Sequence, residues 1–194
     1  PSEKTPLSAL AMQALFEQSC RVGEGTPMHL NQLVFGTADH ARMLLDHPLI
    51  RLVSATGSTA MGKAVAAQMA PRFVRTILEL GGNNAAIVAP TADLALAERA
   101  ILFAAVGTAG QRCTSLRRLI VHRSLYDAFL ERLKAFYLRV TVGNPLDEGV
   151  LVGPVIDEGA YLAMQSALAR ARTDARWIVG GERVRDVQAG FYVR

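Results

Sequence analysis

The chain has 194 residues, and its 21 Lys and Arg residues outnumber its 17 Asp and Glu residues, which gives a formal net charge of +4. Because 51% of the residues are hydrophobic and only 20% are charged, the composition excludes an intrinsically disordered chain and indicates one large domain or parts of two. Two cysteines are too few for a disulfide framework or a zinc cluster, so we expect a reducing, cytoplasmic environment.

Segments typical of helices and of strands alternate along the chain. The sequence predicts helices at 7–20, 38–46, 57–70, 92–106, 125–140 and 158–173, and strands at 31–35, 50–55, 73–80, 85–89, 119–122, 177–179 and 191–193. Strands that alternate with helices through short connections indicate βαβ units and a parallel sheet, and so an α/β fold. A Gly-Gly-Asn-Asn cluster at 81–84 interrupts the pattern, so we place a domain boundary between residues 1–80 and 81–194.

The sequence also argues against several kinds of partner. The basic residues form no long run and aromatic residues make up only 6% of the chain, which disfavours nucleic-acid binding. Uncharged stretches such as 100–111 are too short to span a membrane, and the four histidines show no metal-ligand spacing. The first six residues do not form a signal peptide and contain no initiator Met, so we expect an internal segment of a longer protein.

The first chemical motif is the segment 57–64, Gly-Ser-Thr-Ala-Met-Gly-Lys-Ala, at a predicted strand-to-helix turn. Such a turn directs backbone N–H groups and the positive end of the helix dipole toward an anion, and phosphate fits there. The segment nearly matches a P-loop, but Ala64 stands where a Ser or Thr must bind magnesium, which disfavours a nucleoside-triphosphate hydrolase. A plain tight turn without a ligand fits this motif equally well.

The second motif surrounds Cys113, which lies in a Gly-rich polar segment. Cys20 differs, because its helical surroundings are typical of a small core residue. Arg112 is adjacent to Cys113, and Arg117 and Arg118 follow closely. Cations favour the thiolate form of a nucleophilic cysteine if the fold brings their charges close. Local context alone leaves a catalytic and a structural role equally open.

The third motif is Glu79, at the end of an apolar predicted strand and just before Gly81 and Gly82. A carboxylate in apolar surroundings is costly unless it is paired, solvated or functional. A partly buried carboxylate in a cleft is suited to act as a general base toward water. A strand-end glutamate that simply faces solvent is the alternative.

Together these motifs resemble the aldehyde dehydrogenase superfamily. The matching segments are Ala-Thr-Gly-Ser-Thr-Ala-Met-Gly at 55–62, Leu-Glu-Leu-Gly-Gly-Asn-Asn at 78–84 and Gly-Gln-Arg-Cys-Thr at 110–114, and Glu79 and Cys113 stand 34 residues apart, as in that superfamily. The segments 81–85 and 108–114 most resemble its aminoadipate-semialdehyde (piperideine-6-carboxylate) dehydrogenase, or antiquitin-like, branch. The resemblance implies the C-terminal part of a Rossmann-like NAD-binding domain at 1–80 and the N-terminal part of an α/β catalytic domain at 81–194.

The resemblance implies catalytic roles for two residues. The Cys113 thiolate would attack an aldehyde carbon to give a thiohemiacetal, which passes hydride to NAD and leaves a thioester. Water activated by Glu79 as general base would hydrolyse the thioester, and the Cys113 N–H would stabilise the oxyanion. Arg112 and Thr114 flank the nucleophile and could contact a semialdehyde that carries a carboxylate, although a structural ion pair suits Arg112 as well.

The resemblance also implies a cofactor site, and the spacing of the histidines and cysteines predicts no metal site. Gly57, Ser58 and Gly81 would contact the dinucleotide, and Glu3 would accept hydrogen bonds from the adenosine ribose, which favours NAD over NADP. The oxyanion-hole asparagine and the oligomerisation strand would lie outside this segment, and the full-length protein is expected to be a homo-oligomer, a tetramer or a dimer. A non-catalytic dinucleotide-binding segment stays open as an alternative.

Overall fold

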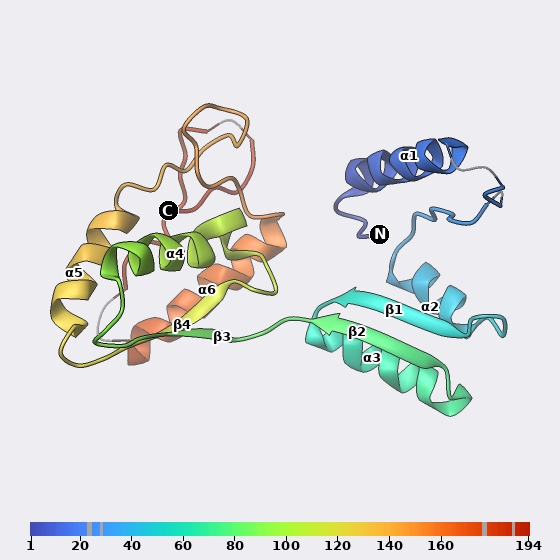
Figure 1. Cartoon of the computed structure of the whole chain (residues 1–194), viewed down its shortest axis with the longest axis horizontal. Helices are drawn as coiled ribbons and strands as arrows, with labels where there is room; N and C mark the ends of the chain where they lie inside the picture. The colour runs from blue at the N-terminus through green and yellow to red at the C-terminus, as the bar shows by residue number, and fades with distance from the viewer. Residues whose placement is uncertain (23–24, 28, 176–177, 188) are drawn as a thin grey trace. The chain divides into compact units, whose positions relative to one another are not determined.

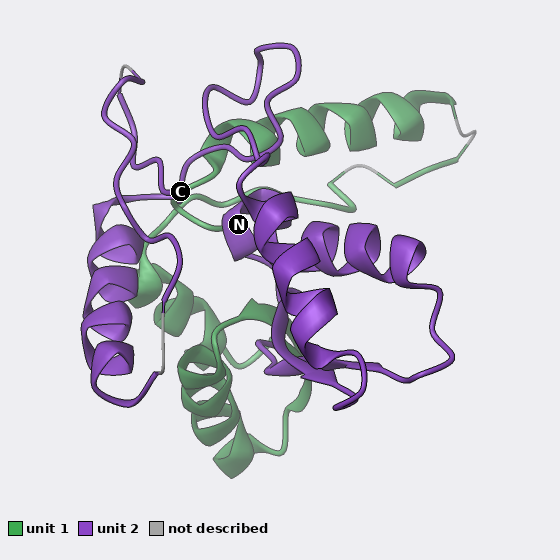
Figure 2. Cartoon of the chain, turned by 90° about the vertical axis from the view of Figure 1, so that its left-hand side faces the viewer, with its two compact units in different colours: residues 1–79 green, residues 80–194 purple. Residues whose placement is uncertain are grey.

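The computed structural model describes residues 1–22, 25–27, 29–175, 178–187 and 189–194. The chain forms two compact units, residues 1–79 and residues 80–194 (Figure 2). The sequence places its domain boundary one residue further along. That the first unit binds a cofactor and the second carries the catalytic thiol stays a prediction.

The first unit contains one βαβ motif (Figure 1). Its elements are α1 (Pro6–Val22), α2 (Ala38–Asp46), β1 (Leu52–Gly57), α3 (Thr59–Met69), the 3-10 helix η1 (Ala70–Arg72) and β2 (Arg75–Leu80). Strands β1 and β2 form a two-stranded sheet, and α3 connects them so that both strands run in the same direction (Figure 1). This arrangement places the carboxyl ends of both strands at one edge of the sheet.

The core of the first unit lies between α3 and the strands. Val53, Val65 and Met69 are buried, and Met69 is fully enclosed. Arg72, in η1 directly after α3, binds the end of α2 and the loop before β1, because its guanidinium donates to the carbonyls of Leu45 and His47 at 2.7 and 3.0 Å. These contacts hold β1, and therefore the turn that follows it, against α3.

The second unit contains a second βαβ motif. Its elements are β3 (Asn84–Val88), α4 (Leu94–Val106), the 3-10 helix η2 (Gly107–Gly110), β4 (Leu116–Val121), α5 (Tyr126–Tyr137) and α6 (Glu158–Asp174). Strands β3 and β4 pair in parallel, which confirms the predicted parallel arrangement. Helix α4 begins where the Asp93 carboxylate accepts hydrogen bonds from the N–H groups of Ala95 and Leu96, a regular N-cap.

The core of the second unit joins β3, α4 and α5. Val88, Ile101, Phe129 and Leu133 are buried together, and Phe129 is fully enclosed. Because α4 packs on β3 and β4, its C-terminal end is fixed, and η2 and the turn before β4 start from that fixed end. The segment that carries Cys113 thus connects two packed elements.

Three predicted strands differ from the structure. Residues 32–37 have no regular structure, so the strand predicted at 31–35 is wrong, because a short apolar run forms a strand only where a partner strand accepts its hydrogen bonds. The strand predicted at 191–193 is reduced to isolated bridges of Phe191 with Val155 and of Val193 with Arg183. Residue 177 of the strand predicted at 177–179 lies outside the described residues, and residues 178 and 179 form no strand.

Among the helices of the described residues, none combines the length and apolar character needed to cross a membrane. In the same parts of the chain, no group of three or more His, Cys, Asp or Glu side chains is arranged to hold a metal ion.

Candidate active site

Cys113 lies in a tight turn between η2 and β4. The Ser115 N–H donates to the Arg112 carbonyl at 3.1 Å, which closes a β-turn with Cys113 and Thr114 as its central residues. The Ser115 hydroxyl accepts a second hydrogen bond from the Arg112 N–H at 3.1 Å, and Ser115 is only 1% exposed. The turn is therefore anchored by a buried serine, while Cys113 itself is exposed.

The loop before this turn has an unusual backbone. Thr108 and Ala109 both have φ of +52° and Gly110 has φ of +69°, so three successive residues are left-handed. Gln111 supports the loop, because its amide donates to the Thr108 carbonyl at 3.1 Å and accepts from the Ile156 N–H at 2.8 Å. Strained backbone of this kind persists only where the surrounding contacts define it well, and it is concentrated at functional sites.

The Arg112 side chain packs against other residues of the second unit. Its Nε donates to the Thr108 hydroxyl at 2.7 Å, and its guanidinium carbon lies 4.8 Å from the centre of the Phe103 ring. Both contacts bind the guanidinium to α4 and to the loop before Cys113. In this conformation Arg112 supports the loop, and the ion pair considered from the sequence is absent among the described contacts.

Arg117 and Arg118 also bind the backbone. Arg117 donates to the Gly110 carbonyl at 2.8 Å, and Arg118 donates to the Asn83 carbonyl at 2.7 Å. The sequence argument required these charges to lie close to the Cys113 sulfur. Within the described residues they bind instead the loop before the turn and the segment before β3.

Asn84 is a site residue for which the sequence assigned no role. Its side-chain amide donates to the carbonyl of Cys113 at 2.7 Å and to the carbonyl of Ser115 at 3.0 Å. Gly82 allows this close approach, since a Cβ there would lie 2.9 Å from the Asn84 side-chain oxygen and 3.4 Å from the Cys113 carbonyl oxygen. The signal in the sequence is a polar amide at the first position of an apolar strand.

Glu79 is the penultimate residue of β2, and it is exposed. Within the described part of the chain its carboxylate accepts no hydrogen bond and forms no ion pair, so its lone pairs are available to a water or a ligand. Gly57 ends the parallel neighbour β1. Glu79 and the turn after Gly57 thus lie at the same edge of the sheet in the first unit.

The turn after β1 leads into α3. The Ser58 hydroxyl accepts from the Met61 N–H at 3.1 Å, and the Ser58 carbonyl accepts from the Gly62 N–H at 2.9 Å. The N–H groups of Thr59 and Ala60 have no acceptor among the described residues. Two free donors at the positive end of a helix fit a phosphate group.

The predicted site residues fall in both units. Glu3, in the turn before α1, belongs with Gly57, Ser58 and Glu79 to the first unit, whereas Gly81, Arg112, Cys113 and Thr114 belong to the second. Glu3, Gly81 and Thr114 are all exposed. Arg112, Cys113 and Thr114 are brought together in one turn.

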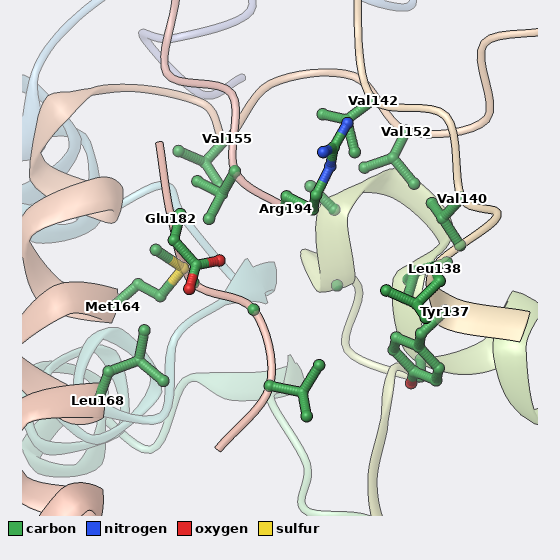
Figure 3. Close-up of a pocket in the computed structure, with 18 of the residues that line it drawn as sticks. Tyr137, Leu138, Val140, Val142, Val152, Val155, Met164, Leu168, Glu182 and Arg194 are labelled. Carbon is green, nitrogen blue, oxygen red and sulfur yellow. The ribbon is translucent and has the colours of Figure 1, made fainter. Parts of the chain in front are cut away.

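The second unit contains a cavity of about 570 Å³, and Figure 3 shows the side chains that line it. Aliphatic side chains line most of it, among them Val142, Val155 and Leu168. Ala109 and Gly110 contribute to the wall, but Cys113 does not. Tyr137 is 39% exposed, and the partial burial of its ring at this wall raises its pKa above the usual value of 10.0. The cavity therefore adjoins the loop before Cys113, and the exposed thiol is not part of its wall.

The comparisons with known proteins agree on one family. The model of the aldehyde dehydrogenase family matches residues 1–194. An alpha-aminoadipic semialdehyde dehydrogenase of Bos taurus is 44% identical over 86% of this chain and 31% of its own length. A crystal structure described as an E. coli NADP dependent enzyme is 35% identical with a TM-score of 0.89 over 100% of this chain and 39% of that one. Betaine aldehyde dehydrogenase from Staphylococcus aureus in complex with NAD+ is 30% identical with a TM-score of 0.88 over 96% of this chain and 36% of that one.

The chain spans less than two fifths of the length of each of these three relatives. The high TM-scores confirm the predicted α/β fold with parts of the kind found in aldehyde dehydrogenases. The family model and the curated relative confirm the family that the three motifs at 55–62, 78–84 and 110–114 indicate. The chain belongs to the aldehyde dehydrogenase family.

Proposed function

We propose that the protein containing this chain oxidises an aldehyde to a carboxylic acid with NAD, using Cys113 as nucleophile and Glu79 as general base. The observation that carries the proposal is the exposed Cys113 at the tip of an anchored turn, in a chain of the aldehyde dehydrogenase family. Glu79 supports it as an exposed carboxylate whose oxygens are free of described partners.

In the proposed first step the Cys113 sulfur forms a bond to the aldehyde carbon, and the carbonyl electron pair moves to the oxygen. The Arg112 carbonyl accepts from Ser115 inside the turn, and a planar trans peptide places the Cys113 N–H on the opposite side. That N–H has no acceptor among the described residues and so is available to the developing oxyanion.

In the second step the carbonyl of the thiohemiacetal re-forms as hydride leaves its carbon, and a thioester remains on Cys113. NAD, when bound, supplies the acceptor for that hydride. Water then attacks the thioester carbon while Glu79 takes the proton of the water. The carbon–sulfur bond breaks, the carboxylic acid leaves, and Cys113 returns to the thiolate.

The residues of the first unit fit a dinucleotide. The free N–H groups of Thr59 and Ala60 beside Ser58 are suited to a pyrophosphate, and Gly57 keeps the approach free of a side chain. Glu3 is an exposed carboxylate, which accepts from a ribose diol and repels a 2′-phosphate, so we infer a preference for NAD. Gly81, exposed at the start of the second unit, is proposed as a further contact of the cofactor.

For the substrate we infer a semialdehyde of the aminoadipate type, because an alpha-aminoadipic semialdehyde dehydrogenase of Bos taurus is 44% identical to the chain. Thr114 is exposed beside Cys113, and we propose it as a further contact of the substrate. The Arg112 guanidinium already contacts Thr108 and Phe103, so its contribution to substrate binding is proposed as secondary. On the family likeness we further infer a cytoplasmic homo-oligomer.

The test measures NADH formation by the full-length protein with aminoadipate semialdehyde. Cys113→Ala should abolish NADH formation, and the matched control Cys20→Ala should retain it. Glu79→Gln should release about one NADH per site in a burst and then turn over slowly, because acylation needs no general base for water. Glu148→Gln, which changes another exposed glutamate, is the matched control.

The nucleophile, the general base and the catalytic activity itself are each contradicted by a different result. Full turnover by Cys113→Ala would remove the nucleophile assignment. A normal steady-state rate in Glu79→Gln would remove the general base. NAD binding without NADH formation in any variant, the unsubstituted protein included, would favour the non-catalytic dinucleotide-binding protein.

A further inference from the structure

The peptide between Cys113 and Thr114 is the central peptide of the turn that carries the thiol. In a β-turn this peptide can rotate, which interchanges type I and type II geometry. Type II requires a positive φ at the third residue, here Thr114, and Thr114 is not among the described residues that have one. The structure therefore holds one of two available orientations of this peptide.

Asn84 binds this central peptide directly. Its amide donates to the Cys113 carbonyl at 2.7 Å, and a second donation at 3.0 Å to the Ser115 carbonyl fixes the amide itself. The two acceptors lie on either side of Thr114, so a single side chain spans the exposed half of the turn. Asn84 begins β3, which pairs with β4 directly after the turn, so the donor stands on a packed element.

The orientation of the peptide determines which group faces the site. Because the peptide is planar and trans, a Cys113 carbonyl that points at Asn84 leaves the Thr114 N–H pointing away from Asn84. If the peptide rotated, the negative end of the carbonyl dipole would replace that N–H. A carbonyl there would repel an aldehyde oxygen that gains negative charge as the sulfur attacks.

We propose that Asn84 is a positioning residue, which holds the central peptide of the Cys113 turn so that its carbonyl stays away from the reacting aldehyde oxygen. The inference rests on the proposed role of Cys113 as nucleophile. This role predicts that substitution of Asn84 changes the rate of NADH formation more than it changes the binding of NAD or the exposure of the Cys113 thiol.

The experiment uses the full-length protein and rapid mixing with NAD and aminoadipate semialdehyde. Asn84→Ala removes both donors, and Asn84→Asp keeps the shape of the side chain but cannot donate. The matched controls are Asn83→Ala and Asn83→Asp, which make the same changes one residue earlier. Alkylation of Cys113 by iodoacetamide, with Cys20 as internal reference, reports thiol exposure separately from turnover.

Asn84→Ala should keep a burst of about one NADH per site while its rate constant falls roughly tenfold, the scale set by the net loss of one to two hydrogen bonds. Asn84→Asp should fall further, because a carboxylate would face two carbonyl oxygens. Cys113 alkylation should stay within about threefold in both Asn84 variants, since it develops no oxyanion. The Asn83 variants should match the unsubstituted protein.

The contrary results separate the inference from the function on which it rests. A normal burst rate in Asn84→Ala overturns the positioning role alone. A reduced burst amplitude together with altered Cys113 alkylation shows that Asn84 only maintains the folded loop, and this also overturns the role. Absence of a burst from the unsubstituted protein, or a burst retained by Cys113→Ala, overturns the proposed function and the inference with it.

Discussion

Glu98 and Arg132 form an ion pair whose two partners differ strongly in exposure. Glu98, on α4, has a side chain that is 3% exposed, whereas the Arg132 side chain, on α5, is 48% exposed. The Arg132 Nε contacts one Glu98 carboxylate oxygen, and the pair connects the two helices that pack beneath β3 and β4. Because α4 leads into the loop before Cys113, the pair bears on the stability of the site.

The difference in exposure predicts an asymmetric response to mutation. Arg132→Met leaves a buried, unpaired carboxylate, which typically costs about 3–5 kcal/mol, and we expect about 3 because water reaches the Arg132 side of the pair. Glu98→Met leaves a cation that is already half in water and fills the buried position with an apolar side chain, so we expect a change within about 1 kcal/mol. The double variant should resemble Glu98→Met.

Hydrogen exchange of the α4 backbone amides in the full-length protein measures the local free energy of opening. Arg132→Met should accelerate this exchange roughly a hundredfold, since about 1.4 kcal/mol corresponds to a factor of ten. Lys134→Met, which removes the exposed pair with Glu131 on the same helix, is the matched control and should change exchange less than about fivefold. Equal acceleration by Arg132→Met and Glu98→Met would refute the reasoning from burial.

Cofactor selectivity, alkaline stability and the loop before Cys113 can each be tested by one measurement. Glu3→Gln should raise kcat/KM for NADP relative to NAD roughly tenfold, because the 2′-phosphate no longer meets a like charge; an unchanged ratio contradicts the assignment. The raised pKa of Tyr137 means that the folded protein holds the phenol proton more tightly than the unfolded chain, so this contribution to stability is present below pH 10.0 and is lost as pH rises through the folded pKa. Tyr137→Phe should flatten that loss in urea unfolding, and an identical pH dependence speaks against it. Alanine fits the backbone of Gly107 (φ −52°, ψ 131°), but the Cβ added by Gly107→Ala would overlap the Arg112 guanidinium and displace it from Phe103. Hydrogen exchange of the loop amides should then rise about tenfold, and unchanged exchange excludes a supporting role for Arg112.

The helices were predictable because their signals are local. The helix predicted at 38–46 is confirmed as Ala38–Asp46, since Thr37 precedes it and Pro48 follows its end. Ser58 and Asp93 likewise stand immediately before α3 and α4 and accept hydrogen bonds from their first turns. Strands depend on partners from elsewhere in the chain, which explains why the prediction at 31–35 fails.

In the candidate site, too, features that depend on local sequence were predictable and features that depend on distant contacts were not. Cys113 and Glu79 are predicted from motifs that are contiguous in sequence. The contacts of Asn84 with the Cys113 turn span 29 residues, and those of Arg118 with Asn83 span 35, so they arise only when β3 and β4 pair. The sequence therefore showed a cluster of cations near Cys113, but not that Arg117 and Arg118 bind backbone carbonyls and that Arg112 binds Thr108 and Phe103.

The sheet of the second unit has an exposed apolar face, and this face decides whether the tests can use the isolated chain or need the full-length protein. Ile87 and Ile120 are paired in register on β3 and β4, yet they are 76% and 54% exposed. Parallel sheets normally bury both faces, and in this unit α4 and α5 cover the face that carries Val88. The relatives are more than twice as long as the part of them that this chain matches. An isolated second unit with an uncovered isoleucine pair would tend to associate through that face, and association would alter burst amplitude and amide exchange irrespective of Cys113, Asn84 or Glu98. The variants therefore discriminate between the proposals only in the full-length protein.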